Sequence, residues 1–204
     1  MDYSFDPIKK SMGYFPIDEV KRKTFHVLTL IYMIAYWVFP WAYVISGMGV
    51  ILLIAMIGET VRLNNPKFNV WLLEKLGGVH RKEEANRMSG LIWTISGSML
   101  TMVIFPDKNI VFACLLYLAL GDSVAALIGK HKGKNKIWNK KTLEGSAACL
   151  VVCIIIGLFL LPLKFALLGA FVATLIETIP WPLNDNFWLP LISAAILTHF
   201  MYLV

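Results

Sequence analysis

Charged side chains are scarce in this sequence. Asp, Glu, Lys and Arg make up 16% of the 204 residues, whereas a soluble domain usually carries about 25%. Hydrophobic residues make up 58%, the mean hydropathy is +0.67, and apolar runs close to the length of a bilayer span recur along the chain. A soluble protein could not bury so much apolar surface. The composition therefore excludes a soluble class and predicts an integral membrane protein with a single all-α bundle over residues 1–204.

Cysteine and the common catalytic motifs are also rare or missing. The three cysteines, an odd number without a CxxC pair, lie in apolar runs and exclude a disulfide framework. No HExxH spacing occurs, which argues against a zinc site. The stretch GKHKGK lacks the residue order of a P-loop, and no GxSxG elbow is present. The polar first 23 residues precede an apolar run without a small-x-small site, so no cleavable signal is expected.

The hydrophobic runs predict a polytopic bundle of about seven transmembrane helices. Pro40 ends the first run, which is short and could lengthen inward through its basic flank, whose long side chains can snorkel. One long tilted or re-entrant segment is the alternative for this N-terminal part of the chain. The predicted spans cover residues 24–39, 42–61, 90–105, 110–129, 144–162, 164–179 and 187–204.

Lys and Arg alternate between the two sides of these spans. Of the 19 basic residues, all but Lys108 and Lys164 fall in the N-terminal tail, in the 62–89 linker or in the 130–143 linker. This bias predicts a cytoplasmic N-terminal tail (residues 1–23) and two cytoplasmic linkers. The net charge of +6 is therefore interpreted as a topology signal, and nucleic acid is not an expected partner.

The acidic residues gather at the same predicted side. Asp122 lies in the apolar run LALGDSVAALIGK, about two helical turns from the cytoplasmic end of its span. A charge within a span costs roughly 2.5–3.5 kcal/mol on insertion scales, so it is usually kept for a function. The other polar residues predicted at this boundary are Glu59, Glu144, Glu177, Asp185 and Asn186.

Carboxylates beside lysines and glycines are typical of a magnesium–nucleotide site. Mg²⁺ binds through one or two carboxylates together with phosphates and water, and lysines and backbone amides bind phosphate oxygens. The linker GKHKGKNKIWNKKTLEGS supplies Gly129, Gly133 and Gly145 for close backbone approach. Its last part opens a helix whose N-terminus attracts anions. The residues alone therefore predict a cytoplasmic magnesium–phosphate site at a membrane surface.

Each of these features also has a structural interpretation. The six lysines of the 130–143 linker could act only as topology signals, and Asp122 could pair with a lysine of another helix. Glu59 and Arg62, three residues apart, could form an interfacial ion pair. Asp185 and Asn186 could belong to a turn that follows two prolines. These interpretations stay open on the sequence alone.

Four stretches resemble the membrane CTP-dependent lipid-alcohol kinases, the group of dolichol kinase, phytol kinase and yeast-type diacylglycerol kinase. RKEEANRMSG at 81–90 also looks like the Arg-x-x-Glu linker of that family. The stretches are KRKTFH at 21–26, ETVR at 59–62, GDSVAALIGKHKGKNKIWNKKTLEGSAA at 121–148 and ETIPWPLNDN at 177–186.

This resemblance implies transfer of the γ-phosphate of CTP to the hydroxyl of a lipid alcohol, which could be a polyprenol or dolichol, phytol or geranylgeraniol, or diacylglycerol. The expected cofactor is Mg²⁺, and the expected location is the cell membrane or an equivalent of the endoplasmic reticulum. The oligomeric state stays open.

We expect Asp122 and Glu144 to bind the metal, directly or through water, and Asn186 to bind the metal or the nucleotide. Asp122, Glu177 and Asp185 are expected to be catalytic, with Glu177 or Asp185 as the base or as a second metal ligand. The expected nucleotide-binding residues are Arg22, Lys23, Gly129, Lys130, Gly133, Lys140, Lys141, Thr142 and Gly145. The expected supporting residues are His26, Glu59, Arg62, Arg81 and Glu84.

Two other functions are compatible with parts of the pattern. CDP-diacylglycerol synthases carry a similar Asp-x-x-Ala…Lys-Lys-Thr-x-Glu-Gly stretch, but they should also show a later Lys-Asp and a His-Gly-Gly followed by two acids. This chain has PWPLNDNFWLP instead. A small transporter would suit acids within the membrane, but its charges should then follow a path across the membrane. Here the charges stop at one leaflet.

Overall fold

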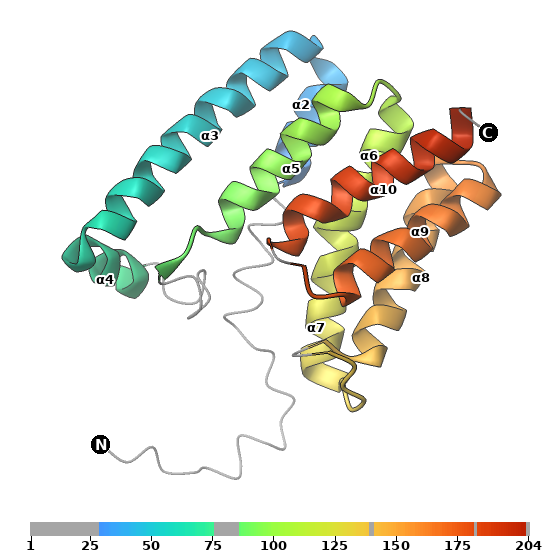
Figure 1. Ribbon diagram of the computed structural model, residues 1–204. Coiled ribbons are helices and arrows are strands. Elements are labelled where there is room, and N and C mark those ends of the chain that lie inside the picture. The colour runs from blue at the N-terminus through green and yellow to red at the C-terminus, as the bar shows by residue number, and fades with distance from the viewer. Residues whose placement is uncertain (1–28, 76–85, 139–140, 182, 203–204) are drawn as a thin grey trace.

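A computed structural model describes residues 29–75, 86–138, 141–181 and 183–202 of the chain (Figure 1). No β-strand occurs among these residues, which contain one isolated antiparallel bridge between Lys136 and Thr142. The predicted all-α class is therefore confirmed for the described part. The elements are α2 (Thr29–Val38), α3 (Trp41–Asn64), α4 (Pro66–Lys75), α5 (Gly90–Ile104), α6 (Lys108–Leu116), the π-helical turn η3 (Tyr117–Gly121), α7 (Asp122–Lys132), α8 (Leu143–Leu160), α9 (Leu163–Thr178) and α10 (Asp185–Tyr202).

Apart from α4, the described helices coincide with the predicted hydrophobic segments. Three of them are long and apolar enough to cross a membrane: α3, α8, and the continuous helix Lys108–Lys132 that joins α6, η3 and α7. At 1.5 Å per residue, the 24 residues of α3 extend for about 36 Å. Helices α2 and α5 are apolar but shorter. That all seven segments span a membrane therefore stays a prediction, as does the orientation of the N-terminus.

Local capping explains where several helices begin. Pro40 and Pro162 immediately precede α3 and α9, where a residue without an N–H group costs the helix nothing. The Asp107 side chain accepts a hydrogen bond from the Ile110 backbone N–H at 3.0 Å and caps α6. The Thr142 hydroxyl accepts one from the Gly145 N–H at 3.2 Å and caps α8. The breaks between the hydrophobic runs are thus encoded locally.

Helix α4 was not predicted, because it lies in the 62–89 segment, which we interpreted as a linker. Its start carries a recognisable signal: Asn65 accepts a hydrogen bond from the Phe68 N–H at 3.1 Å, and Pro66 occupies the first helical position. An asparagine followed by proline is therefore the local pattern that could have identified this helix.

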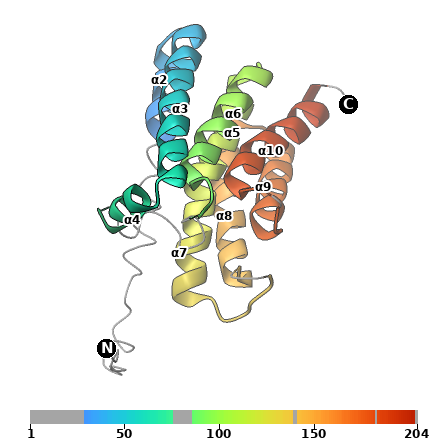
Figure 2. The ribbon, with the colours of Figure 1, turned by 60° about the vertical axis from the view of Figure 1, so that its left-hand side comes forward.

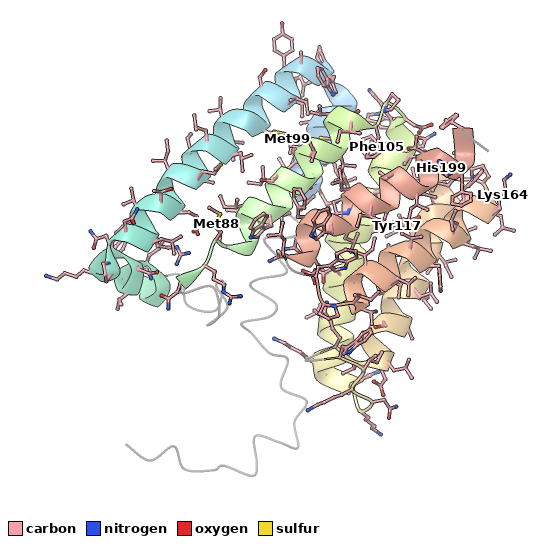
Figure 3. All side chains as sticks on the ribbon, in the orientation of Figure 1. Met88, Met99, Phe105, Tyr117, Lys164 and His199 are labelled. Carbon is pink, nitrogen blue, oxygen red and sulfur yellow. The ribbon has the colours of Figure 1, made fainter. Side chains whose placement is uncertain are left out.

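The ends of the helices separate into two sides of the bundle. The α3–α4 junction, the start of α5 and the α7–α8 and α9–α10 linkers lie on one side (Figures 1 and 2). The α2–α3, α5–α6 and α8–α9 turns and the end of α10 lie on the other side. Lys164, one of the two basic residues outside the predicted cytoplasmic segments, is on this second side (Figure 3). The arrangement agrees with the predicted alternation of linkers.

The helix Lys108–Lys132 forms the centre of the molecule. Of an 18-residue apolar stretch in this helix, 72% is buried inside the bundle, whereas the corresponding share for α3 is 17%. Around it, one core cluster contains Tyr117, Cys153 and Ala170, and a second contains Met33 and Met102. Tyr117 lies well inside the bundle in Figure 3. Asp122 begins the second half of this central helix and is itself buried.

The cysteines provide a natural reporter of unfolding. Cys114, Cys149 and Cys153 are all free and fully buried, which agrees with the expectation that the chain has no disulfide framework. Buried thiols react slowly with a thiol-reactive dye until the protein opens. Dye reaction on heating therefore follows the unfolding of the bundle in detergent.

Gly97 allows the start of α10 to pack directly against α5. A Cβ atom at this position would lie 2.8 Å from the Cα and the O of Phe187 and 3.0 Å from the O of Asn186. These neighbours are backbone atoms, so α10 would have to move. We expect Gly97→Ala to destabilise the protein by about 1–3 kcal/mol and to lower the temperature at which the dye reacts.

Gly47→Ala in α3 is the matched control, because nothing lies within 4 Å of a Cβ built at Gly47. Alanine is also the better helix former there. An equal loss of stability in the two variants would contradict the contact between α5 and α10.

Candidate functional site

A π-helical turn immediately precedes Asp122. The turn η3 adds a residue to one helical turn, which changes the direction of the side chains that follow. Gly121 closes the turn, and a Cβ at Gly121 would lie 2.6 Å from Cys153 Sγ, so glycine permits the approach of α8. Asp122 is only 4% exposed. Single π turns of this kind are frequent at functional sites.

Lys141 connects two acidic residues from separate helices. Its Nζ donates a hydrogen bond to the Glu177 carboxylate at the end of α9 and another to Asp185 Oδ2, at 3.1 Å, at the start of α10. The side chains of Lys141, Glu177 and Asp185 are 29%, 2% and 17% exposed. The α7–α8 linker and the α9–α10 turn therefore meet at one place.

The charge of Asp122 acts at the same place. Burial alone would lower the pKa of Lys141, but the charges of Asp185, Asp122 and Glu177 together raise the pKa above its ordinary value. Lys141 therefore stays protonated at neutral pH. We call Asp122, Lys141, Glu177 and Asp185 the acid–lysine cluster. The ammonium group of Lys141 bonds to two of these carboxyl groups, and the charge of the third acts on it as well.

Glycines bring α7 and the start of α8 into close contact. A Cβ at Gly145 would lie 2.7 Å from the O of Ala125, and a Cβ at Gly133 would lie 2.2 Å from the O of Gly129. The Thr142 hydroxyl lies against Gly129 and Gly133 while it caps α8. The three predicted glycines thus have a packing role. That these glycines and the exposed Lys130 lie against a phosphate stays a prediction.

Glu144 and Asn186, two of the predicted metal ligands, lie in different surroundings. The Glu144 carboxylate accepts hydrogen bonds from the Asn135 backbone N–H, at 3.2 and 3.3 Å, and from Asn135 Nδ2 at 3.0 Å. These bonds join the start of α8 to the preceding linker. Asn186 is buried in the first turn of α10, directly after Asp185 of the cluster.

Glu59 and Arg62 form a buried ion pair, as the structural interpretation of ETVR predicted. Arg62 Nε and Nη2 donate to the two carboxylate oxygens of Glu59, at 3.0 and 2.7 Å. Arg62 also donates to Asn69 Oδ1 of α4 at 2.9 Å and to the carbonyl O of Arg87 at 2.7 Å. Glu59 accepts from the Ser89 N–H at 3.0 Å. The pair therefore ties the end of α3 to α4 and to the start of α5.

Six of the predicted site residues lie outside the described part of the chain, so their roles stay predictions. They are Arg22, Lys23, His26, Arg81, Glu84 and Lys140.

Sequence reasoning missed an aromatic group beside the cluster. Phe187 and Trp188 follow Asn186 directly, and their ring centroids are 5.0 Å apart. The ring centroid of Trp93 in α5 lies 6.0 Å from that of Phe187, and the centroid of Trp181 lies 5.8 Å from that of Trp188. The local signal was the aromatic pair in NDNFW, but only packing brings Trp93 to it.

The chemistry of the donors suits Mg²⁺. Carboxylate and amide oxygens are the hard ligands that this ion prefers, and Asp122, Glu177, Asp185 and Asn186 supply them. In the described part of the chain, no three His, Cys, Asp or Glu side chains form a ready metal site. A magnesium ion that arrives with a nucleotide needs only one or two carboxylates from the protein. The residues therefore fit an ion that the phosphates of a nucleotide also bind.

Comparison with known proteins finds similarity to an uncharacterized bacterial protein and to fungal lipid kinases. It is 28% identical over 202 residues to an uncharacterized protein of Rickettsia prowazekii, covering 91% of this chain and 96% of the relative. It is 29% identical over 163 residues to the CTP-dependent diacylglycerol kinase 1 of Schizosaccharomyces pombe, covering 70% and 74%. It is 28% identical over 213 residues to the enzyme of the same name from Eremothecium gossypii, covering 86% of this chain and 65% of the relative.

No protein-family model and no solved structure matches the chain. The similarity to the two fungal enzymes extends over most of the chain, as does the resemblance drawn from the motifs. That resemblance is therefore confirmed by relatives that are named CTP-dependent diacylglycerol kinase 1.

Proposed function

We propose that this chain is an integral membrane kinase that transfers the γ-phosphate of CTP to the hydroxyl of a lipid alcohol at the cytoplasmic leaflet. The observation that carries the proposal is the acid–lysine cluster, in which the nucleotide-site stretch at 121–148 and the acidic stretch at 177–186 meet through Lys141. Diacylglycerol is the acceptor that we put first, because the fungal relatives are named for it. Polyprenols, dolichol, phytol and geranylgeraniol are the alternatives.

The position of the cluster suits a reaction between a soluble and a membrane-bound substrate. Glu177 and Asp185 lie at the ends of apolar helices, on the side of the 130–143 linker. A lipid hydroxyl at headgroup depth and a nucleotide from the water could both reach such a place. We propose that this side is cytoplasmic, together with the N-terminal tail and the 62–89 linker, and that residues 1–204 form one kinase domain.

Phosphoryl transfer depends mainly on positioning and on neutralising charge. We propose that Lys141, with Lys130 and Lys140, binds the phosphate oxygens. Glu177 or Asp185 accepts the proton of the lipid hydroxyl. The lipid oxygen then forms a bond to the γ-phosphorus while the bond from that phosphorus to the β–γ bridging oxygen breaks, and CDP leaves. The carboxylate that accepted the proton later releases it to water.

For the metal, we propose Asp122 and Asn186 as ligands, together with whichever of Glu177 and Asp185 does not act as the base. The hydrogen bonds of Glu144 to Asn135 argue against Glu144 as a direct partner of Asp122. When bound, Mg²⁺ supplies charge neutralisation on the β- and γ-phosphates. The near-complete burial of Asp122 keeps its carboxylate from being hydrated in bulk water, which strengthens its interaction with a cation.

An assay of the purified protein in lipid nanodiscs tests the function. CTP and ATP, each labelled in the terminal phosphate, are offered with diacylglycerol, a polyprenol, dolichol, geranylgeraniol or phytol. We expect labelled phosphate in the lipid product with CTP, and at least about tenfold less with ATP, which corresponds to about 1.4 kcal/mol of discrimination.

Nanodiscs without an added lipid alcohol are the control for this assay. Release of pyrophosphate together with a CDP-lipid would identify a cytidylyltransferase instead and overturn the proposal. Absence of any nucleotide-dependent lipid product would also reject it, and would leave transport as the function to examine.

A further inference from the structure

Lys141 occupies the place where a bound cation would be expected. Its ammonium group lies between Glu177 and Asp185, which come from different helices, and the charge of Asp122 acts on the ammonium as well. Glu177 is only 2% exposed, and Asp122 is 4% exposed. Buried carboxylates without a counter-charge are strongly unfavourable. The ammonium group of Lys141 supplies a counter-charge to Glu177 and Asp185 by direct hydrogen bonds.

A metal-bound triphosphate would compete for the same oxygens. Mg²⁺ binds carboxylate oxygens at about 2.0–2.1 Å, and an ammonium group hydrogen-bonded to those oxygens would stand close to the ion and repel it. The phosphates of the nucleotide, in contrast, offer Lys141 a strong alternative partner. Binding of the phosphates to Lys141 would therefore free the acids to bind the metal. Binding of the metal to the acids would in turn favour the move of Lys141 to the phosphates.

The geometry of the linker allows such an exchange without unfolding. The Lys141 backbone is held on both sides, because its N–H donates to the O of Trp138 at 2.8 Å and its O accepts from the Ile137 N–H at 3.0 Å. The side chain, in contrast, is a flexible four-carbon stem that ends in a compact charge. Rotation of this stem can move the ammonium group while the turn stays in place.

We propose that Lys141 is a place-holding cation: in the nucleotide-free protein it neutralises Glu177 and Asp185, and it moves to the phosphates when a divalent cation enters with the nucleotide. The inference rests on the proposed function, because it assigns a nucleotide–metal complex to this site. Its consequence is that a divalent cation alone binds poorly, since the ammonium group already occupies the acids.

Binding of Mn²⁺ without nucleotide tests the inference. Mn²⁺ takes the same oxygen ligands as Mg²⁺, and the free ion can be counted by electron paramagnetic resonance. We expect Lys141→Met to bind Mn²⁺ at least about tenfold more tightly than the unchanged protein, a difference of about 1.4 kcal/mol. Without metal, the variant should unfold at a lower temperature in the thiol-dye measurement, and Mn²⁺ should raise that temperature.

Lys136→Met is the matched control, because Lys136 is an exposed lysine of the same linker; its Mn²⁺ affinity should equal that of the unchanged protein. Adding Glu177→Gln to Lys141→Met should remove most of the gain. If the Lys141→Met protein does not fold, the double variant Lys141→Met with Asp185→Asn is measured instead, because it removes one charge of each sign. Mn²⁺ should then still bind more tightly than to the unchanged protein, through Asp122 and Glu177.

Equal Mn²⁺ affinity in the Lys141→Met variant and the unchanged protein would overturn the inference, as would a gain of the same size in Lys136→Met. Neither outcome depends on catalysis. A protein that phosphorylates no lipid would reject the proposed function even if the Mn²⁺ result were as expected, so the two failures can be told apart.

Discussion

Asp122→Asn is expected to lower the rate of lipid phosphorylation by about 10²–10³-fold, a loss typical of removing one electrostatic group from an active site. Asparagine preserves the volume but removes the charge that acts on Lys141 and that we propose binds the metal. The variant should still insert and fold, because a neutral amide is easier to bury than a carboxylate. The measurement is the initial rate with saturating labelled CTP in nanodiscs, together with the dye-detected unfolding temperature.

Asp107→Asn provides the control for this prediction. Asp107 lies at the start of α6, on the side of the bundle away from the cluster, and caps the helix through Ile110. Asparagine is an equally good N-cap residue, so activity should be unchanged. Near-normal activity of the Asp122→Asn protein would reject the metal-binding role of Asp122 and leave the residue a structural one.

Arg62→Met is expected to destabilise the protein by about 3–5 kcal/mol, because it leaves the Glu59 carboxylate buried without its counter-charge. Arg62 is completely buried and also joins α3 to Asn69 and to the carbonyl of Arg87. Loss of this residue should therefore loosen α4 and the start of α5 together. The thiol-dye unfolding temperature in detergent measures the effect.

The double variant Glu59→Gln with Arg62→Met should recover part of the lost stability, since it removes the buried carboxylate charge as well. Lys67→Met, at an exposed position of α4, should change stability by less than about 0.5 kcal/mol. An Arg62→Met protein that unfolds at the same temperature as the Lys67→Met protein would show that the buried ion pair contributes little.

Several elements of the fold could be predicted because their causes are local. Long apolar runs identify the helices of the bundle, and prolines and capping residues such as Asp107 and Thr142 mark where helices begin. Helix α4 was missed although its Asn65–Pro66 start is also a local signal. The π-helical turn before Asp122 had no such signal, and neither had the close approach of α8 to Gly121 at its end.

The candidate site was predicted only in part, and the reason is again physical. Asp122, Lys141, Glu177 and Asp185 each stood out as charges at the edges of apolar segments. The sequence does not reveal distances between segments. It could therefore not show that the Glu144 carboxylate bonds to Asn135, or that Lys141 joins the acids of α9 and α10.

The sequence by itself determined that this chain is built from apolar helices, which linkers carry its basic charge, and which family its motifs resemble, because all of these follow from composition and order along the chain. Only the tertiary structure decided which charges meet. Residues 141, 177 and 185 come together because helix packing, helped by glycines that let backbones touch, overcomes their separation in the sequence. The cost of burying a charge without a partner then selects the pairing.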